Sequence, residues 1–295
     1  MVYAFGEILW DIFGEKRVIG GAPFNFAAHF ASLGGDAALI SAVGDDPLGE
    51  EALRAMRGLH VSDRFVQRNT ARPTGSCAVS LDSSGVPQYR LAADTAFDSI
   101  RYDEALRAAF AAPEADVLYF GTLAQRAETS RRTLRSIAAR PFRERFCDLN
   151  LRPPFLDGDV IVHACENASI LKLSLEECAY LSELRLIDSL APERVCAALC
   201  GRFPNIRLLL LLTLGRDGAM LYTGEHGPMQ SIRPESEAVS TVGAGDSFSA
   251  CFLYNYLAGR SLQECLDRGV LLSDYVVTQT GAVPAYPAAL REAVR

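Results

Sequence analysis

Positions 243 to 246, Gly-Ala-Gly-Asp, combine residues that could bind an anion with one that could accept a proton. An apolar pattern with helical spacing follows, through Phe248, Cys251, Phe252 and Tyr256, which predicts that the glycines open a helix. The first N–H groups of a helix have no partner within it and lie at the positive end of its dipole, so they suit a phosphate. Asp246, in the first turn, could take the proton of a hydroxyl that attacks this phosphate. The motif therefore predicts the chemistry of a kinase.

A tight turn with an acidic cap is the alternative for this motif, because Asp is favoured at helix starts. A dinucleotide site is disfavoured, since Phe248 occupies the position at which that fingerprint needs its third glycine. A second glycine pair, Gly20 and Gly21, supports the anion-binding interpretation, because it also opens an apolar helical pattern, which begins near Pro23. Asn25 lies in the first turn and would face the same entrance; a solvated helix-start residue is the alternative there.

The composition predicts one large globular domain. The chain has 295 residues, of which 49% are hydrophobic and 22% charged, enough for a packed core. A net charge of −7 without a basic run argues against a nucleic-acid partner. We expect no membrane partner, because the first residues lack the pattern of a signal peptide and the longest apolar run, residues 208–212, is too short to cross a bilayer. Eight cysteines without a Cys-x-x-Cys pair predict buried, reduced thiols in a cytoplasmic protein rather than a zinc site.

Strand-like and helix-like segments alternate along most of the chain. We expect strands at residues 2–9, 37–43, 117–120, 145–149, 169–173, 208–214 and 219–222. We expect helices at residues 23–33, 47–59, 128–139, 174 onward, 243–257, 261–278 and 287–294. Capping-box spacing marks the starts at Ser174 and Ser261. This alternation predicts an α/β fold in a single domain, with a mainly parallel central sheet and helices on both faces.

Residues 72–95 interrupt the alternation with a hairpin, whose strands we expect at 76–81 and 86–91. The hairpin could be a lid, a subunit contact or an edge of the main sheet. Polar residues follow two of the expected strands: Asp11 follows the first, and the run from Asp148 to Arg152 ends another. Open α/β sheets bind ligands at the carboxyl ends of their strands, so we expect these side chains near the site.

Together these features resemble the ribokinase-like sugar kinases, the phosphofructokinase-B family, over essentially the whole chain. Residues 20–35 and 43–49 look like the N-terminal signature of that family, and residues 243–246 look like its C-terminal signature. The stretch Asp148-x-Asn150-x-Arg152 is most similar to the branch of fructokinases and 2-keto-3-deoxygluconate kinases. The resemblance implies a ribokinase-like three-layer fold over residues 1–295, with a small β lid formed by about residues 11–20 and 72–95.

The resemblance also implies roles for individual residues. Asp246 matches the base that deprotonates a primary hydroxyl of the sugar, and the matching anion hole is formed by Gly243, Ala244 and Gly245. Sugar-binding positions are matched by Asp11, Gly20, Gly21, Asn25, Arg90 and Arg152. Nucleotide-binding positions are matched by Lys172, Ser174, Thr213, Gly215 and Gly218. Glu177 matches a residue that holds Mg²⁺ through water. For Arg90, an ordinary surface arginine is the alternative.

Three positions depart from the family pattern. Ser174 stands where the family usually has Asn, Ser240 where Asp often occurs, and Val242 where Thr is common. Ser174 still offers a hydroxyl, so the magnesium network would be altered rather than lost. The backbone N–H groups do not depend on the side chain of Val242, and none of the departures affects Asp246.

The implied activity is ATP-dependent phosphorylation of a primary hydroxyl on a small sugar. Fructose is the first candidate, and 2-keto-3-deoxygluconate is second because two arginines could meet its carboxylate; ribose and nucleosides follow. A non-catalytic sugar or nucleotide sensor on the same scaffold is the competing class. The implied cofactors are ATP and Mg²⁺, with a monovalent cation as a further candidate. The assembly stays open between a homodimer through the lid and a monomer.

Overall fold

The structure is a computed structural model that describes residues 1–81, 87–111, 115–212, 218–232 and 237–295. Nine strands of this described chain form the central sheet. In spatial order they are β13 (Gly227–Ser231), β12 (Ala219–Thr223), β11 (Leu208–Leu212), β10 (Ile170–Ser174), β9 (Phe142–Asp148), β8 (Ala115–Phe120), β1 (Val2–Phe5), β4 (Ala37–Gly44) and β5 (Ser62–Asn69). Neighbours from β11 to β5 pair in parallel, whereas β12 and β13 add an antiparallel edge.

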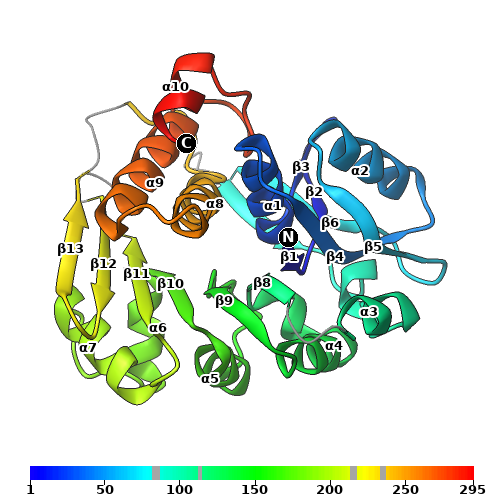
Figure 1. The fold of residues 1–295 in the computed structure, drawn as a ribbon. Coiled ribbons are helices and arrows are strands. Elements are labelled where there is room, and N and C mark those ends of the chain that lie inside the picture. The colour runs from blue at the N-terminus through cyan, green and yellow to red at the C-terminus, as the bar shows by residue number, and fades with distance from the viewer. Residues whose placement is uncertain (82–86, 112–114, 213–217, 233–236) are drawn as a thin grey trace.

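Helices cover both faces of this sheet (Figure 1). One face carries α1 (Ala22–Ser32), α2 (Pro47–Gly58), α8 (Ala244–Leu257) and α9 (Leu262–Val277), with α10 (Ala288–Ala293) beyond them. The other face carries α3 (Glu104–Ala109), α4 (Glu128–Ala138), α5 (Gly158–Asn167), α6 (Glu177–Glu183) and α7 (Pro192–Arg202). Side chains of a strand alternate between the two faces. Accordingly Val2 and Ala4 join the core under α1 and α8, while Phe5 joins the core on the opposite face.

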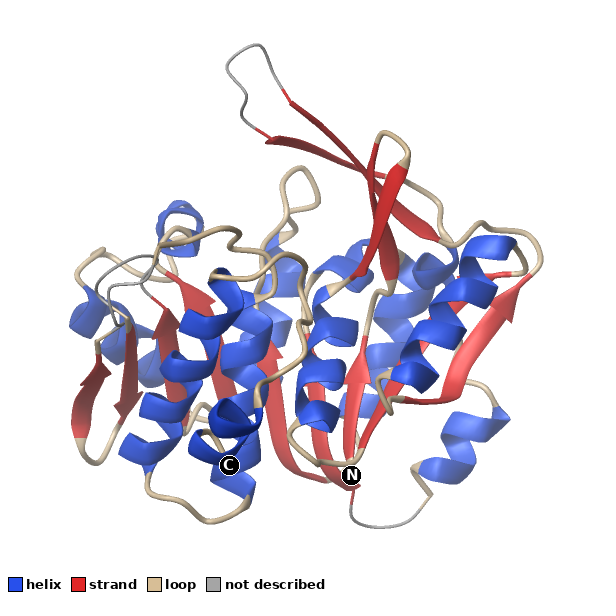
Figure 2. Cartoon of the chain, turned by 90° about the horizontal axis from the view of Figure 1, so that it is seen from above, coloured by secondary structure: helices blue, strands red, loops and turns tan. Residues whose placement is uncertain are grey.

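A smaller sheet of four strands stands apart from the main one in the described chain. Its order is β3 (Lys16–Gly20), β2 (Leu9–Phe13), β6 (Gly75–Leu81) and β7 (Pro87–Leu91). It projects from the side of the molecule away from both termini (Figure 2). Trp10, whose indole N–H donates to the carbonyl of Leu48 at 3.1 Å, ties this small sheet to α2.

The expected three-layer α/β fold is confirmed, and two details of it were wrong. The first strand does not run from residue 2 to residue 9: β1 ends at Phe5, the chain turns, and Leu9 begins the separate small sheet. Asp11 therefore lies inside β2, not after a strand of the main sheet. Two strands at the sheet edges were missed, because β5 is largely polar and β13 carries Pro228, features common at edges.

Two short 3₁₀ turns complete the framework near the site. They are η1 (Ala96–Ser99), which follows β7, and η2 (Leu123–Arg126), which follows β8. The order of the parallel strands reverses between β1 and β8, since β4 and β5 lie on one side and β9 to β11 on the other. Ligands of open α/β sheets bind at such a switch point, beyond the carboxyl ends of the strands. The fold therefore places the site where β1 and β8 end, below the small sheet.

Candidate active site

A cavity of about 1040 Å³ opens at this switch point. Its walls come from the ends of β1 and β10, the entrances of α1 and α8, the small sheet, and the loop that follows β9. That volume is at the upper end of the range for small-molecule sites. The cavity therefore has room for two ligands side by side.

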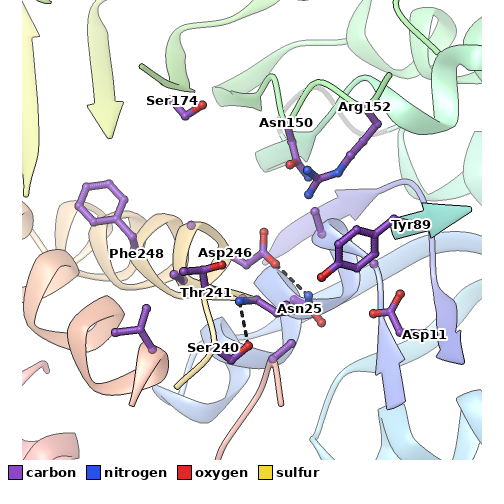
Figure 3. A pocket seen from close by; sticks show the side chains of 18 of the residues that line it. Asp11, Asn25, Tyr89, Asn150, Arg152, Ser174, Ser240, Thr241, Asp246 and Phe248 are labelled. Atoms are coloured by element: carbon purple, nitrogen blue, oxygen red, sulfur yellow. Dashed lines mark hydrogen bonds between the residues drawn. The ribbon is translucent and has the colours of Figure 1, made fainter. Parts of the chain in front are cut away.

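Asp246 lies in the first turn of α8 with its carboxylate directed into the cavity (Figure 3). It is 9% exposed, and its Oδ2 accepts a hydrogen bond from Nδ2 of Asn25 at 2.8 Å. Burial, and after it the charge of Asp148, raises the pKa of Asp246 to about 6. At neutral pH the carboxylate is ionised yet more basic than an ordinary Asp, as suits a general base.

Asn25 comes from the first turn of α1, so the two glycine-opened helices meet at this hydrogen bond. Its Oδ1 is buried and has no hydrogen-bond partner among the described residues. A buried acceptor without a partner is unfavourable, and a hydroxyl of a ligand would satisfy it. The structure thus brings two of the expected side chains together and leaves one oxygen for a ligand.

The glycines at the two entrances allow close backbone approach. Gly243, the N-cap of α8, has a φ of +83°, and a Cβ there would lie 2.4 Å from the carbonyl oxygen of Ala282. Gly21 has a φ of +107°, and a Cβ there would lie 2.5 Å from the carbonyl oxygen of Glu7. Ala244 and Gly245 continue from Gly243 along the wall of the cavity. The first N–H groups of α8 are therefore at hand for an anion beside Asp246.

A buried ion pair lies next to the first residues of α8 in this wall. Nζ of Lys172, in β10, lies 2.9 and 3.0 Å from the two carboxylate oxygens of Asp148, and the hydroxyl of Tyr119 donates to Asp148 at 3.2 Å. A Cβ on Gly245 would come within 2.8 Å of Nζ of Lys172. Burial alone would lower the pKa of Lys172, but the charges of Asp148, Glu177 and Asp246 raise it above the ordinary value. This cation thus lies beside the expected anion hole.

Glu177 also lines the cavity, and its carboxylate is hydrogen-bonded to two backbone N–H groups. Its carboxylate accepts hydrogen bonds from the N–H groups of Leu151 at 2.5 Å and Ser174 at 2.6 Å. The predicted capping box at Ser174 is only half correct, because α6 begins at Glu177 with Glu176 as its N-cap and without a side-chain cap. Burial raises the pKa of Glu177 above its ordinary value. Among the described residues, no group of three or more His, Cys, Asp or Glu side chains could hold a metal ion.

Glu7 was missed by the sequence analysis, although it lines the cavity and is only 4% exposed. It follows β1, and the backbone N–H groups of Glu7 itself and of Ala22, at the entrance of α1, act on its carboxylate to lower its pKa. Burial raises its pKa to about 7; the charge of Arg152 opposes this rise and that of Asp246 adds to it. A carboxylate two residues beyond the end of a parallel strand was the signal that could have identified it.

Asp11 and Arg152 reach the same end of the cavity from opposite walls (Figure 3). Asp11 comes from β2, where burial raises its pKa, and Arg152 comes from the loop after β9 with Asn150. Arg152 is exposed, and its positive charge acts on Asp11, Glu7 and Asp246. Among the residues that the structure describes, this acceptor end therefore combines several carboxylates with one arginine.

The structure places Arg90 elsewhere. Tyr89 and Leu91 line the cavity, whereas Arg90 between them is exposed and does not. Because side chains alternate along β7, Arg90 points to the opposite face of the small sheet. Gly20 likewise does not line the cavity; it pairs with Leu9 in the small sheet, and a Cβ there would lie 3.0 Å from a carboxylate oxygen of Asp11.

The other end of the cavity fits the expected nucleotide site. Its walls include Ser174, Gly218, Ser240 and Val242. Thr213 and Gly215 lie outside the described residues. The hydroxyl of Ser240 accepts a hydrogen bond from the N–H of Val242 at 3.3 Å, so it caps the turn that leads into Gly243. All three departures from the family pattern thus lie at this end of the cavity.

Comparisons with known proteins agree with this geometry. The model of the family described as pfkB family carbohydrate kinase matches residues 7–289. A fructokinase of Klebsiella pneumoniae is 31% identical over 95% of this chain and 91% of its own length. A protein named probable fructokinase-2 from Arabidopsis thaliana is 27% identical over 97% of this chain and 93% of its own. The crystal structure of a fructokinase with bound ATP from Xylella fastidiosa shares the fold, with a TM-score of 0.84 at 22% identity over 99% of this chain and 97% of its own.

Proposed function

The chain belongs to the pfkB family of carbohydrate kinases, and from this premise we propose that it transfers the γ-phosphoryl group of ATP to a primary hydroxyl of a small neutral sugar, with fructose as the first candidate. The observation that carries the proposal is the position of Asp246. Its carboxylate is buried at the entrance of α8, beside the first N–H groups of that helix and opposite the carboxylates and arginine of the acceptor end.

In this mechanism Asp246 receives the proton of the attacking hydroxyl, and Asn25 holds the carboxylate in place. The N–H groups at Gly243 to Gly245 stabilise the charge of the transferring phosphoryl group, aided by the cation of Lys172. The protein would thus contribute alignment and electrostatic stabilisation rather than covalent chemistry. ATP is the proposed donor, and its adenosine end would lie toward Ser174 and Gly218.

Mg²⁺ fits this donor set as a water-bridged ion. Glu177 offers a buried carboxylate at the cavity wall whose oxygens each retain room for a further hydrogen bond. Mg²⁺ keeps several waters and needs few protein ligands when phosphates are present, so the lack of an all-protein cluster in the described residues agrees with it. Bound there, it would neutralise negative charge on the phosphates.

The acceptor end favours a neutral sugar over a sugar acid. The case for 2-keto-3-deoxygluconate needed two arginines. Of the arginines in the described ranges only Arg152 lines the cavity, since Arg90 lies on the far face of the small sheet. Around this guanidinium lie the carboxylates of Glu7, Asp11 and Asp246. An anionic acceptor would meet a surplus of like charge, whereas sugar hydroxyls could donate to these carboxylates.

The small sheet is proposed to act as the lid over this end, because Phe13 and Tyr89 line the cavity from it yet are 43% and 58% exposed. A homodimer through this lid and a monovalent-cation requirement stay predictions of the family resemblance. No helix in the described ranges combines the length and apolar character needed to cross a membrane. All eight cysteines are unpaired, which supports our placement of the protein in the reducing cytoplasm.

A coupled assay of ADP release across a panel of sugars tests the proposal. We expect release that depends on sugar, with fructose turned over more efficiently than 2-keto-3-deoxygluconate, ribose or nucleosides. Binding of sugar and ATP without turnover would instead support the sensor alternative. ADP release at equal rates with and without sugar would contradict both interpretations.

A further inference from the structure

Arg126, at the end of η2, occupies an unusual position for a residue that does not line the cavity. Its guanidinium forms a two-pronged ion pair with Asp98, with Nε 2.7 Å from Oδ1 and Nη2 2.8 Å from Oδ2. The side chains of Arg126 and Asp98 are only 7% and 4% exposed. Nη1 is buried and has no hydrogen-bond partner among the described residues. A buried ion pair with a spare donor is not what stability alone favours, because desolvation offsets most of its attraction.

The contacts of Arg126 reach the segment that leaves the small sheet. Nη2 also donates to the carbonyl of Ala92 at 2.7 Å, directly after β7 ends. The N–H of Ala92 in turn donates to the carbonyl of Ser76 in β6 at 2.9 Å. Asp98 caps η1 by accepting from the N–H of Thr95 at 2.9 Å. One guanidinium thus fixes the base of the hairpin that carries Tyr89 and Leu91 into the cavity.

The same guanidinium reaches the loop that carries Arg152. It lies between two aromatic rings, 4.7 Å from the centroid of Phe97 and 4.5 Å from that of Phe155. Phe155 belongs to the same turn as Arg152, because its N–H donates to the carbonyl of Arg152 at 2.8 Å. A planar guanidinium can stack and form a two-pronged ion pair at once, which a lysine cannot.

From these contacts we propose that Arg126 is a positioning residue for the acceptor end, which holds the hairpin base and the Arg152 loop at a fixed separation. Tyr89 and Leu91 line one wall of that end, and Asn150 and Arg152 line the facing wall. Each wall has its own anchor to Arg126, through Ala92 and Asp98 on one side and Phe155 on the other. Arg126 therefore sets the fit of the sugar without touching it. This inference rests on the proposed function for its kinetic readout.

Two variants and one control test this arrangement. Arg126→Met removes the ion pair, the carbonyl contact and the stacked cation while keeping a side chain of similar length. Phe155→Leu removes only the stacking on the Arg152 loop, and it keeps the protein testable if Arg126→Met does not fold, since Phe155 is only half-buried. Arg207→Met is the control, because Arg207 also forms a close ion pair with a buried carboxylate, that of Glu144 at 2.6 Å. This pair lies at the amino ends of the strands, on the side of the sheet away from the cavity.

We expect Arg126→Met and Phe155→Leu to raise KM for fructose on the order of tenfold, because the two walls lose their alignment, and to leave KM for ATP within about twofold. Arg207→Met should lower the melting temperature and change neither KM. Folded variants that keep the native KM for fructose, or that raise both KM values equally, would overturn the proposal.

Hydrogen exchange of the backbone amides gives a readout that needs no turnover. In Arg126→Met, the amides of residues 87–98 and of residues 150–157 should both exchange on the order of tenfold faster, whereas Arg207→Met should leave both segments as in the native protein. Faster exchange in only one segment, or in neither, would contradict a shared anchor. If the native protein showed no sugar-dependent ADP release, the proposed function would fail, and the exchange result would still decide the role of Arg126.

Discussion

Buried carboxylates lie at both ends of the strands of the central sheet, and their surroundings differ. The side at which the parallel strands begin is called the amino edge, and the side at which they end is called the carboxyl edge. At the amino edge, Glu144 is 3% exposed and accepts hydrogen bonds from Ser169, Arg207 and Tyr256. At the carboxyl edge, Glu7 and Asp246 are also buried, and burial is the chief reason that their pKa values rise to about 7 and about 6. The charge of Glu144 is thus compensated, whereas the charges of Glu7 and Asp246 are available for a ligand. Uncompensated charge of this kind is typical of a functional site.

The largest expected effect comes from a substitution that displaces the N-terminal backbone of α8. Gly243→Ala would place a Cβ against the backbone of Ala282 at a positive φ, so the first N–H groups of the helix must move. We expect kcat to fall by about 10²- to 10³-fold, the range for losing a donor to a developing charge. Steady-state kinetics with saturating sugar and ATP measures this.

Gly259→Ala is the matched control, because Gly259 has a φ of +77° but no atom within 4 Å of a Cβ. It should lose about 1 kcal/mol of stability from the left-handed backbone and keep its kcat. Equal loss of kcat in both variants would show that backbone strain, not the helix entrance, matters.

Glu7→Gln should stabilise the protein at high pH. The folded-state pKa of about 7 lies above the ordinary 4.5, so the contribution of Glu7 to stability is fully present below 4.5 and lost as the pH rises through about 7. This shift corresponds to roughly 3 kcal/mol at pH 8, which glutamine would not lose. Urea unfolding at pH 8 and pH 4 should show a variant that is more stable at pH 8 and similar to the native protein at pH 4. If the difference in unfolding free energy between variant and native protein were the same at both pH values, ionised Glu7 would not destabilise the fold.

At the amino edge the same kind of change should act in the opposite direction. Glu144→Gln removes the charge that Arg207 and the two hydroxyls compensate, so we expect the free energy of unfolding to fall by about 2 kcal/mol. The kcat should not change, because Glu144 lies at the edge away from the cavity. Urea unfolding at pH 7 and the steady-state rate measure both effects. A stabilised Glu144→Gln variant would remove the contrast between the two edges.

Sequence alone predicted the parts of the site that depend on local pattern. The helix entrance at Gly243 and the position of Asp246 follow from glycines placed before an apolar helix, and the structure agrees. Arg90 was expected near the substrate but does not line the cavity. The sequence already offered the reason, since Tyr89 and Leu91 flank it and side chains alternate along a strand. The face of a sheet toward which a side chain points is fixed only when its strand pairs with a neighbouring strand.

Other features depend on contacts between distant segments. Glu7 lies in an apolar run that looks like one strand, and only the separation of β1 from β2 turns it toward α1. The positioning role proposed for Arg126 depends on its contacts with Asp98 and Phe155. These residues lie on either side of it in the sequence and come together only in the fold. The polar edge strand β5 forms because β4 offers it a parallel partner, against its local pattern.

The central claim is that the carboxylate of residue 246 accepts the proton of a sugar hydroxyl in phosphoryl transfer. It is tested most directly by comparing native protein with Asp246→Asn in two measurements, sugar-dependent ADP release at pH 8 and calorimetric binding of fructose and of ATP. We expect the variant to bind both ligands within about threefold of native affinity and to lose on the order of 10²-fold or more in kcat. Native turnover in Asp246→Asn would contradict the account.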